Sequence, residues 1–172
     1  AGPAGMAAPR PGPAVALARQ AAEFLGKDGG PQVVVLDMGG WDTHANQAAP
    51  QGALAVNLRQ LDTALAALRE GLITHGRWSR TAVLVCTEFG RQVEVNGTQG
   101  TDHGSGGAAF LLGGAVDGGR VLTDWPGLAP SQRFEGRDLR ITTDLRAVFR
   151  TLLAEHLQVS RAVIDGEALP GT

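Results

Sequence analysis

The sequence predicts an α/β fold in which a mostly parallel sheet is flanked by helices. Short apolar runs alternate with long amphipathic patterns of helical period, which is the order of elements expected of such folds. Glycine accounts for 25 of the 172 residues, about twice the usual share, and it clusters beside the apolar runs. Glycine clusters in these positions are typical of loops that follow strands.

The first two predicted elements are a helix over residues 13–25 and a strand over residues 33–36. The helix carries its apolar side chains on one side and ends before Gly26. The run "VVVL" is apolar on both faces, which favours a strand buried in a parallel sheet that ends at Asp37.

The longest predicted helix covers residues 54–72. Its leucines recur at steps of four and three residues, which places them in one stripe along about five helical turns. The stripe consists of Leu54, Leu58, Leu61, Leu65, Leu68 and Leu72.

Further strands are predicted over residues 82–87 and 108–112. The short run "GGRVL" is expected to pair with its neighbour as a hairpin. An amphipathic helix over residues 141–157 closes the predicted domain.

Composition limits the domain organisation and the partners. We expect residues 1–12 to be a flexible segment and residues 13–172 to form a single α/β domain. With 15 basic and 17 acidic residues, the charge gives no case for binding nucleic acid or an anionic membrane. No apolar run approaches the roughly 18 residues that a membrane-spanning helix needs.

The first polar cluster is "DMGGWDTH", after the strand predicted at residues 33–36. Asp37, Asp42 and His44 offer carboxylate and imidazole groups, which are ligands for divalent zinc or manganese. Ligands in parallel sheets gather outside the carboxyl ends of the strands, where this cluster is expected. The alternative is that Asp42 or Thr43 caps the following helix and His44 is an exposed loop residue.

The second polar cluster, "TEFGR", follows the strand predicted at residues 82–87. Glu88 is a candidate metal ligand or base, and Arg91 is a candidate bidentate clamp for an anionic group. A simple Glu88–Arg91 ion pair at the rim of the sheet is the alternative.

The third polar cluster, "GTDHGSGG", immediately precedes the strand predicted at residues 108–112. His103 is a candidate metal ligand, and Asp102 either orients its imidazole or binds the metal directly. The cluster lacks the spacing and lysine of a phosphate-binding loop, and no helix follows it, so we reject a nucleotide site.

Three segments together resemble the bacterial domain-of-unknown-function family 1501. They are "DMGGWDTHANQ", "TEFGRQVEVNGTQGTDHGSGGAAFLLGGAVDGGRV" and "LRITTDLRAVFRTLLAEHL". The family is grouped with alkaline phosphatases and sulfatases, so the resemblance implies an alkaline-phosphatase-like fold with a two-metal site. It also implies that Asp37 and His44 bind metal, with Asp42 competing for the role of Asp37, and that His103 is a further ligand.

The chain departs from that superfamily at two places. Glu88-Phe89 stands where the superfamily usually has Asp-His, and nothing before Val33 resembles the strand that carries its nucleophile. The chain therefore resembles the C-terminal half of such a domain, an incomplete version of the fold. A fragment, a degraded copy and domain loss all stay open, and a partner chain is one source of the missing half.

The resemblance implies a metal-dependent hydrolase that cleaves phosphate or sulfate esters, which are small anionic substrates. We expect this chain alone to be inactive or weakly active, because the nucleophile region is missing. The alternative is a non-catalytic binding or structural domain that retains the fold. The family resemblance alone suggests a periplasmic or extracellular location.

Overall fold

The computed structural model describes residues 12–47 and 50–171, which fall into two compact units. The helical unit comprises Ala1–Asp42 and Gln47–Ser79, and the strand unit comprises Thr43–Asn46 and Arg80–Thr172. The predicted flexible segment, residues 1–12, lies outside the described residues except for Gly12.

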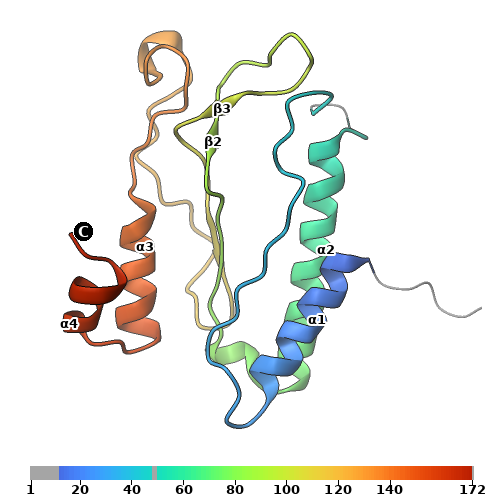
Figure 1. Ribbon diagram of the computed structural model, residues 1–172, viewed down its shortest axis with the longest axis vertical. Coiled ribbons are helices and arrows are strands. Elements are labelled where there is room, and N and C mark those ends of the chain that lie inside the picture. Colours follow the sequence, from blue (N-terminus) through green and yellow to red (C-terminus); the bar gives the residue numbers. More distant parts are fainter. Residues whose placement is uncertain (1–11, 48–49, 172) are drawn as a thin grey trace, which may run out of the picture. The chain divides into compact units, whose positions relative to one another are not determined.

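Two helices form the helical unit, at the positions that the sequence predicts. Helix α1 spans Pro13–Gly26 and begins with a proline in its first turn, where the missing N–H costs no hydrogen bond. Helix α2 spans Ala53–Thr74, and α1 lies along its C-terminal half (Figure 1).

Small side chains form the contact between α1 and α2. Helix α1 buries Ala18, Ala21 and Ala22, and α2 buries Ala64, Ala67, Leu68 and Leu72. A Cβ atom at Gly71 would lie 2.5 Å from the Cβ atom of Ala22, so glycine allows the two helices to approach closely. The leucine stripe is therefore buried only toward its end, while Leu58 stays 46% exposed.

The strand unit contains two antiparallel pairs of strands. Strands β1 (Val83–Val85) and β4 (Phe110–Leu112) pair with Leu84 opposite Leu111. Strands β2 (Gly90–Arg91) and β3 (His103–Gly104) pair with Arg91 opposite His103 (Figure 1).

The predicted mostly parallel sheet is wrong. Within residues 12–47 and 50–171 both sheets are two-stranded and antiparallel, and neither the run at 33–36 nor "GGRVL" forms a strand. Val121 and Leu122 are 88% and 86% exposed. An apolar run indicates that a segment favours burial, but it does not indicate whether the neighbouring strand runs parallel or antiparallel to it. The prediction of a parallel sheet required that direction, which the sequence pattern does not provide.

The C-terminal helix that the sequence predicts is present but shorter and divided. Helix α3 spans Leu145–Thr151 and continues as a π-helical turn, η3 (Leu152–His156). Asp144 caps α3 by accepting a hydrogen bond from the backbone N–H of Arg146 at 2.9 Å.

The remaining elements are short. Helix α4 spans Arg161–Val163 and leads into a second π-helical turn, η4 (Ile164–Ala168). Two 3₁₀ turns, η1 and η2, cover Trp78–Arg80 and Pro130–Gln132. Over the part of the chain that the structure describes, none of the helices combines the length and apolar character needed to cross a membrane.

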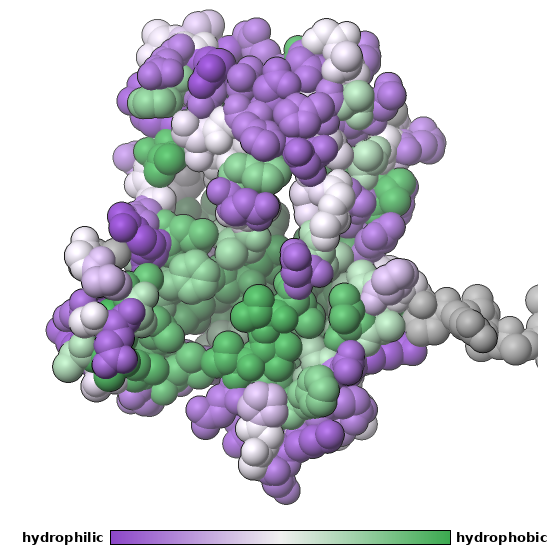
Figure 2. All heavy atoms as spheres, viewed as in Figure 1, coloured by the Kyte–Doolittle hydropathy of each residue, from purple (hydrophilic) through white to green (hydrophobic). Residues whose placement is uncertain are grey.

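Large apolar side chains stay exposed in both units. Val35 in the helical unit is 87% exposed, and Phe110 and Trp125 in the strand unit are 57% and 59% exposed. Figure 2 shows apolar residues gathered at the surface of the face it presents.

Candidate metal centre

A glycine-rich hairpin is the scaffold of the candidate site. Strands β2 and β3 are its arms, and the backbone N–H of Gln92 donates to the carbonyl of Asp102 at 3.0 Å. At the tip, the N–H of Asn96 donates to Gly100 and the N–H of Gln99 donates to Asn96, which closes a tight turn. Gln99 accordingly adopts a left-handed φ of 64°.

The segment Thr43–Asn46 binds along this hairpin through backbone hydrogen bonds. The N–H of Asn46 donates to Thr98 at 3.0 Å, and the N–H of Thr101 donates to Thr43 at 3.3 Å. A Cβ atom at Gly100 would collide with the backbone carbonyl group of His44, so the close approach requires glycine there. This pairing brings His44 beside residues that lie more than fifty positions later in the sequence.

Three potential metal ligands meet at this place. Asp42, His44 and His103 each offer a ligand atom, and the three atoms lie within 4.8 Å of one another. Asp42 precedes His44 by two residues, and His103 is the first residue of β3. The rings of His44 and His103 have centroids 5.0 Å apart, and all three residues are exposed.

Asp102 orients one of these histidines. Its Oδ1 lies 3.0 Å from Nδ1 of His44, and hydrogen bonds from His44 and then Asn96 hold the pKa of Asp102 below its usual value. A carboxylate that is ionised at neutral pH can only accept, so Nδ1 of His44 is the donor, and in the neutral form of the ring the lone pair is then on Nε2. Histidines that bind metal usually donate the N–H of their other ring nitrogen to a carboxylate, a backbone carbonyl or water, and the pair of His44 and Asp102 has this form.

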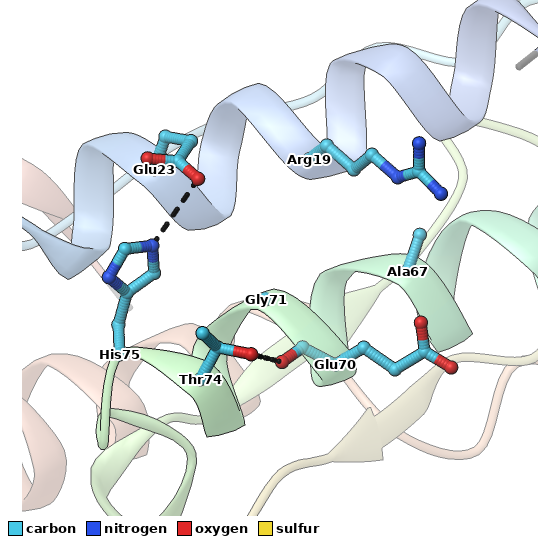
Figure 3. Close-up of a pocket in the computed structure, with 7 residues that line it drawn as sticks. All are labelled: Arg19, Glu23, Ala67, Glu70, Gly71, Thr74 and His75. Atoms are coloured by element: carbon cyan, nitrogen blue, oxygen red, sulfur yellow. Dashed lines mark hydrogen bonds and ion pairs between the residues drawn. The ribbon is translucent and has the colours of Figure 1, made fainter.

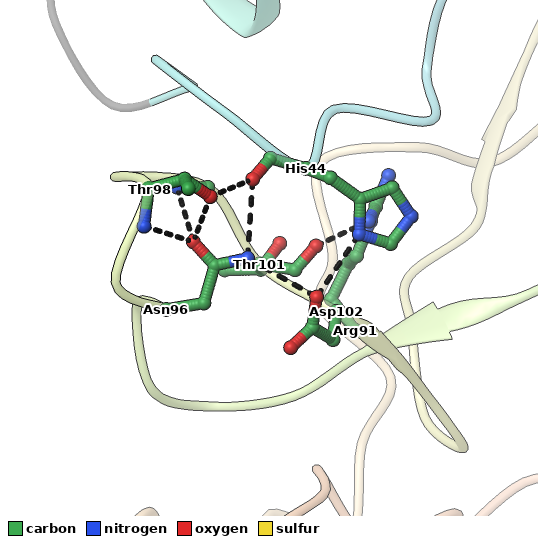
Figure 4. Close-up of polar contacts among 7 residues, drawn as sticks. His44, Arg91, Asn96, Thr98, Thr101 and Asp102 are labelled. Atoms are coloured by element: carbon green, nitrogen blue, oxygen red, sulfur yellow. Dashed lines mark hydrogen bonds and ion pairs between the residues drawn. The ribbon is translucent and has the colours of Figure 1, made fainter.

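Asn96 connects these groups (Figure 4). Its Nδ2 lies 3.1 Å from both the backbone carbonyl of His44 and Oδ1 of Asp102. Its Oδ1 accepts from the backbone N–H groups of Thr98 and Gly100 at 3.1 and 2.9 Å. One carboxamide therefore joins the turn, the segment around His44 and the carboxylate of Asp102.

An aromatic stack holds the other histidine. The ring of Phe89 lies parallel to the ring of His103, with centroids 4.2 Å apart and an interplanar angle of 16°. The guanidinium carbon of Arg91 lies 5.0 Å from the centre of the Phe89 ring, and its Nη1 donates to the carbonyl of Thr101 at 2.5 Å. Arg91 is also the residue opposite His103 across the two strands, and its charge helps to lower the pKa of Asp102.

The structure thus brings together five of the residues that the sequence singled out: Asp42, His44, Arg91, Asp102 and His103. Asp37 is exposed in the helical unit, Glu88 is exposed in the strand unit, and neither is a member of the three-ligand group. The alternative in which Asp42 or Thr43 caps the next helix is wrong, because Gly52 is the N-cap of α2. The other half of that alternative, that His44 is an exposed loop residue, agrees with the structure.

Sequence reasoning missed Asn96 and the part played by Phe89. The dipeptide Asn96-Gly97 is a turn signal, and it could have marked residues 96–99 as the tip of a hairpin. The sequence carries no comparable signal that the side chain of Asn96 reaches Asp102.

Asp138 forms a separate polar group with Arg137 and with Ser105, the residue that follows β3. Asp138 is only 2% exposed, and its carboxylate accepts from Arg137 Nε at 2.7 Å and from the Ser105 hydroxyl at 2.9 Å. These hydrogen bonds, that of Arg137 first, lower the pKa of Asp138. Ser105 therefore stabilises a buried carboxylate in this structure.

A groove of about 240 Å³ lies between α1 and α2 in the helical unit (Figure 3). Its polar residues contact one another, since His75 Nε2 lies 3.4 Å from Glu23 Oε1 and the Thr74 hydroxyl donates to the carbonyl of Glu70. These contacts are those of two helices packed side by side, and the groove contains none of the residues predicted to bind metal.

Comparison with known families agrees with the three sequence segments. A model of the family described as "Protein of unknown function (DUF1501)" matches residues 5–168. The chain belongs to this family. The family part of the resemblance is thereby confirmed, and the description of the family assigns no activity. No curated protein and no solved structure matches the chain.

Proposed function

We propose that this DUF1501 chain provides the metal-binding part of a metal-dependent hydrolase that cleaves phosphate or sulfate esters. The observation that carries the proposal is the meeting of Asp42, His44 and His103 within 4.8 Å, with Asp102 hydrogen-bonded to His44. The proposed relation to the alkaline phosphatase and sulfatase superfamily rests on the sequence motifs.

The donor set fits a catalytic zinc or manganese ion. Two imidazoles and one carboxylate are one of the recurring sets of three protein ligands in catalytic zinc sites, which keep a further position for water or substrate. The exposure of all three residues supports access from solvent. A bound ion of this kind would supply Lewis-acid polarisation of an ester oxygen.

The residues around the donor set suit an anionic substrate. Asp102 keeps the proton of His44 on Nδ1, so that Nε2 is the nitrogen suited to coordination. Arg91, which lies opposite His103 across the strands, adds a guanidinium that stacks on Phe89 and whose charge would favour a phosphate or sulfate group. We propose Arg91 as the anion-binding residue of the site.

A second candidate is a binding domain without catalysis. The hydroxyl of Ser105 donates to Asp138, and the hydroxyl of Thr98 lies 2.6 Å from the carbonyl of His44. Both hydroxyl groups thus hold the backbone around the site, an observation that favours metal binding in which neither of them serves as a nucleophile.

Metal content tests the proposal. The purified chain is loaded with zinc or manganese, dialysed, and analysed by mass spectrometry of the metal. We expect stoichiometric metal in the wild type and its loss in His44→Ala and His103→Ala, while His75→Ala and His156→Ala retain it. A wild-type chain that holds no metal would overturn the proposal.

Two further variants and one assay define the rest of the site. Asp37→Asn and Glu88→Gln test whether these predicted ligands contribute to metal affinity. Hydrolysis of aryl phosphates and aryl sulfates tests the reaction, and we expect it to be weak or absent for this chain alone.

The exposed apolar residues support an accompanying proposal, that another polypeptide segment covers them and supplies the nucleophile. Val35, Val121 and Leu122 are each more than four-fifths exposed, and apolar surface of this kind is typical of interaction sites. Gain of ester hydrolysis on mixing this chain with a nucleophile-bearing region of the same family is the expected result.

A further inference from the structure

We propose that Asn96 is the positioning residue of the metal centre, because its carboxamide fixes the carboxylate of Asp102 and thereby the orientation and tautomer of His44. This inference rests on the proposed function and deepens it. Asn96 acts on the ligand atoms indirectly, through its hydrogen bonds to Asp102 and to the backbone of His44.

The NH₂ group of the Asn96 carboxamide restrains His44 in two ways, once directly and once through Asp102. One N–H of Nδ2 reaches the backbone carbonyl of His44 at 3.1 Å, and the other reaches Oδ1 of Asp102 at 3.1 Å. The same Oδ1 accepts from Nδ1 of His44 at 3.0 Å. Asn96 therefore holds both the main chain of His44 and, through Asp102, its ring.

The acceptor side determines which way the carboxamide faces. Oδ1 of Asn96 lies 3.1 and 2.9 Å from the backbone N–H groups of Thr98 and Gly100, and 2.9 Å from the Thr98 hydroxyl. Backbone N–H groups can only donate, so a reversed carboxamide would set donor against donor. The turn thus forces the NH₂ group toward His44 and Asp102 (Figure 4).

The connection matters because the hydrogen bond between His44 and Asp102 lies at an exposed position. The side chains of His44 and Asp102 are 47% and 49% exposed, and an exposed pair of this kind gives little rigidity by itself. Metal ligands must be held close to their productive geometry, and partners of ligands commonly change metal affinity by about 10- to 100-fold. Two hydrogen bonds from one residue that is anchored in a tight turn supply that restraint.

Asn96→Asp tests the NH₂ group of Asn96 separately from its oxygen, because it replaces only the donor. An aspartate keeps an oxygen for the N–H groups of Thr98 and Gly100, but it places a second oxygen against Asp102 and the carbonyl of His44. We expect zinc affinity, measured by competition with a chromophoric chelator, to fall about 10- to 100-fold. Gln158→Glu is the matched control, because it makes the same change in charge at an amide that donates to the carbonyl of Glu155.

The tautomer of His44 provides a readout that does not depend on metal. In ¹⁵N-labelled, metal-free protein, two-bond ¹H–¹⁵N spectra should show the proton of His44 on Nδ1 in the wild type and in Gln158→Glu. Asn96→Asp should show a mixture of tautomers. If Asn96→Asp fails to fold by circular dichroism, Asn96→Ala provides the same two readouts without the added charge.

The outcomes separate this inference from the proposed function. Wild-type metal binding with unchanged affinity in the folded Asn96 variant overturns the role of Asn96 and leaves the metal site intact. A wild type that binds no metal, but whose His44 tautomer depends on Asn96, refutes the metal centre and supports the positioning role. An identical tautomer in the wild type and the variant overturns the positioning role.

Discussion

Nδ1 of His44 lies 3.0 Å from Oδ1 of Asp102, although 58 positions separate the two residues in the sequence. Both side chains are about half exposed, so their interaction contributes little to the stability of the fold. What it determines is which nitrogen of His44 carries the proton. Histidines that bind metal commonly have such a carboxylate partner, so the interaction suits the proposed metal site.

Asp102→Asn should weaken metal binding without unfolding the protein. The asparagine keeps the shape of the side chain but lacks the charge that keeps the proton on Nδ1 of His44. We expect about a 10- to 100-fold loss of zinc affinity by chelator competition, with little change in the urea midpoint. Asp117→Asn is the control, since Asp117 pairs at the surface with Arg120. Equal affinity in the wild type and Asp102→Asn would show that the carboxylate does not orient the ligand.

The carboxyl group of Asp102 should titrate below the ordinary aspartate value of about 3.9. Hydrogen bonds from His44 and Asn96 favour its ionised form, and this lowers its pKa. A lowered pKa means that the contribution to stability is present above the unfolded-state value and is lost as the pH falls through the folded-state value. Carbon-13 spectra of the carboxyl group should show this midpoint, and Asn96→Ala should move it upward. A wild-type midpoint at or above about 3.9 would contradict the hydrogen bonds from His44 and Asn96 to Asp102.

The sequence identified the helices more reliably than the sheet. The leucines of α2 and the stop at Gly26 depend on local periodicity and on a local backbone preference, which a single sequence displays. Strands β1 and β4 lie within their predicted runs, but their antiparallel pairing is a long-range relationship. Hydrophobic pattern therefore located β1 and β4, but it misassigned their pairing and predicted strands at residues 33–36 and 118–122 that the structure does not contain.

The candidate site was predictable in part of its residues and unpredictable as an arrangement, since Asp37 and Glu88 were also predicted as ligands and are not members of the three-ligand group. Carboxylates and histidines next to glycines identified His44, Asp102 and His103 as candidates from chemistry alone. Their meeting depends on backbone hydrogen bonds between Thr43–Asn46 and residues 98–101, and such bonds leave no signature in side-chain type. The part played by Asn96 is hidden for the same reason.

Gly100→Ala should destabilise the hairpin because the added methyl group would collide with the backbone of His44. A clash with main chain cannot be relieved by rotating a side chain, and overpacking of this kind costs about 1–3 kcal/mol. Gly97→Ala is the matched control three residues away, because a Cβ atom there meets nothing within 4 Å. We expect Gly97→Ala to change the free energy of unfolding by less than about 0.5 kcal/mol. Equal urea midpoints for the two variants would refute the close approach of the two segments.

Asp138→Asn should destabilise the strand unit more than a surface substitution of the same kind. Asp138 is 2% exposed, and its carboxylate accepts from both Arg137 and Ser105, so the neutral amide would turn a donor toward one of these donors. Leaving a buried hydrogen-bonding group without its partner costs about 1–3 kcal/mol, measurable by urea unfolding at neutral pH. The difference between wild type and variant should shrink in acid, because the lowered pKa of Asp138 means that its contribution is lost as the pH falls through the folded-state value. Asp124→Asn makes the same change in charge at the surface and is the control. If Asp138→Asn loses no more stability than this control, the buried carboxylate does not anchor Ser105 and Arg137.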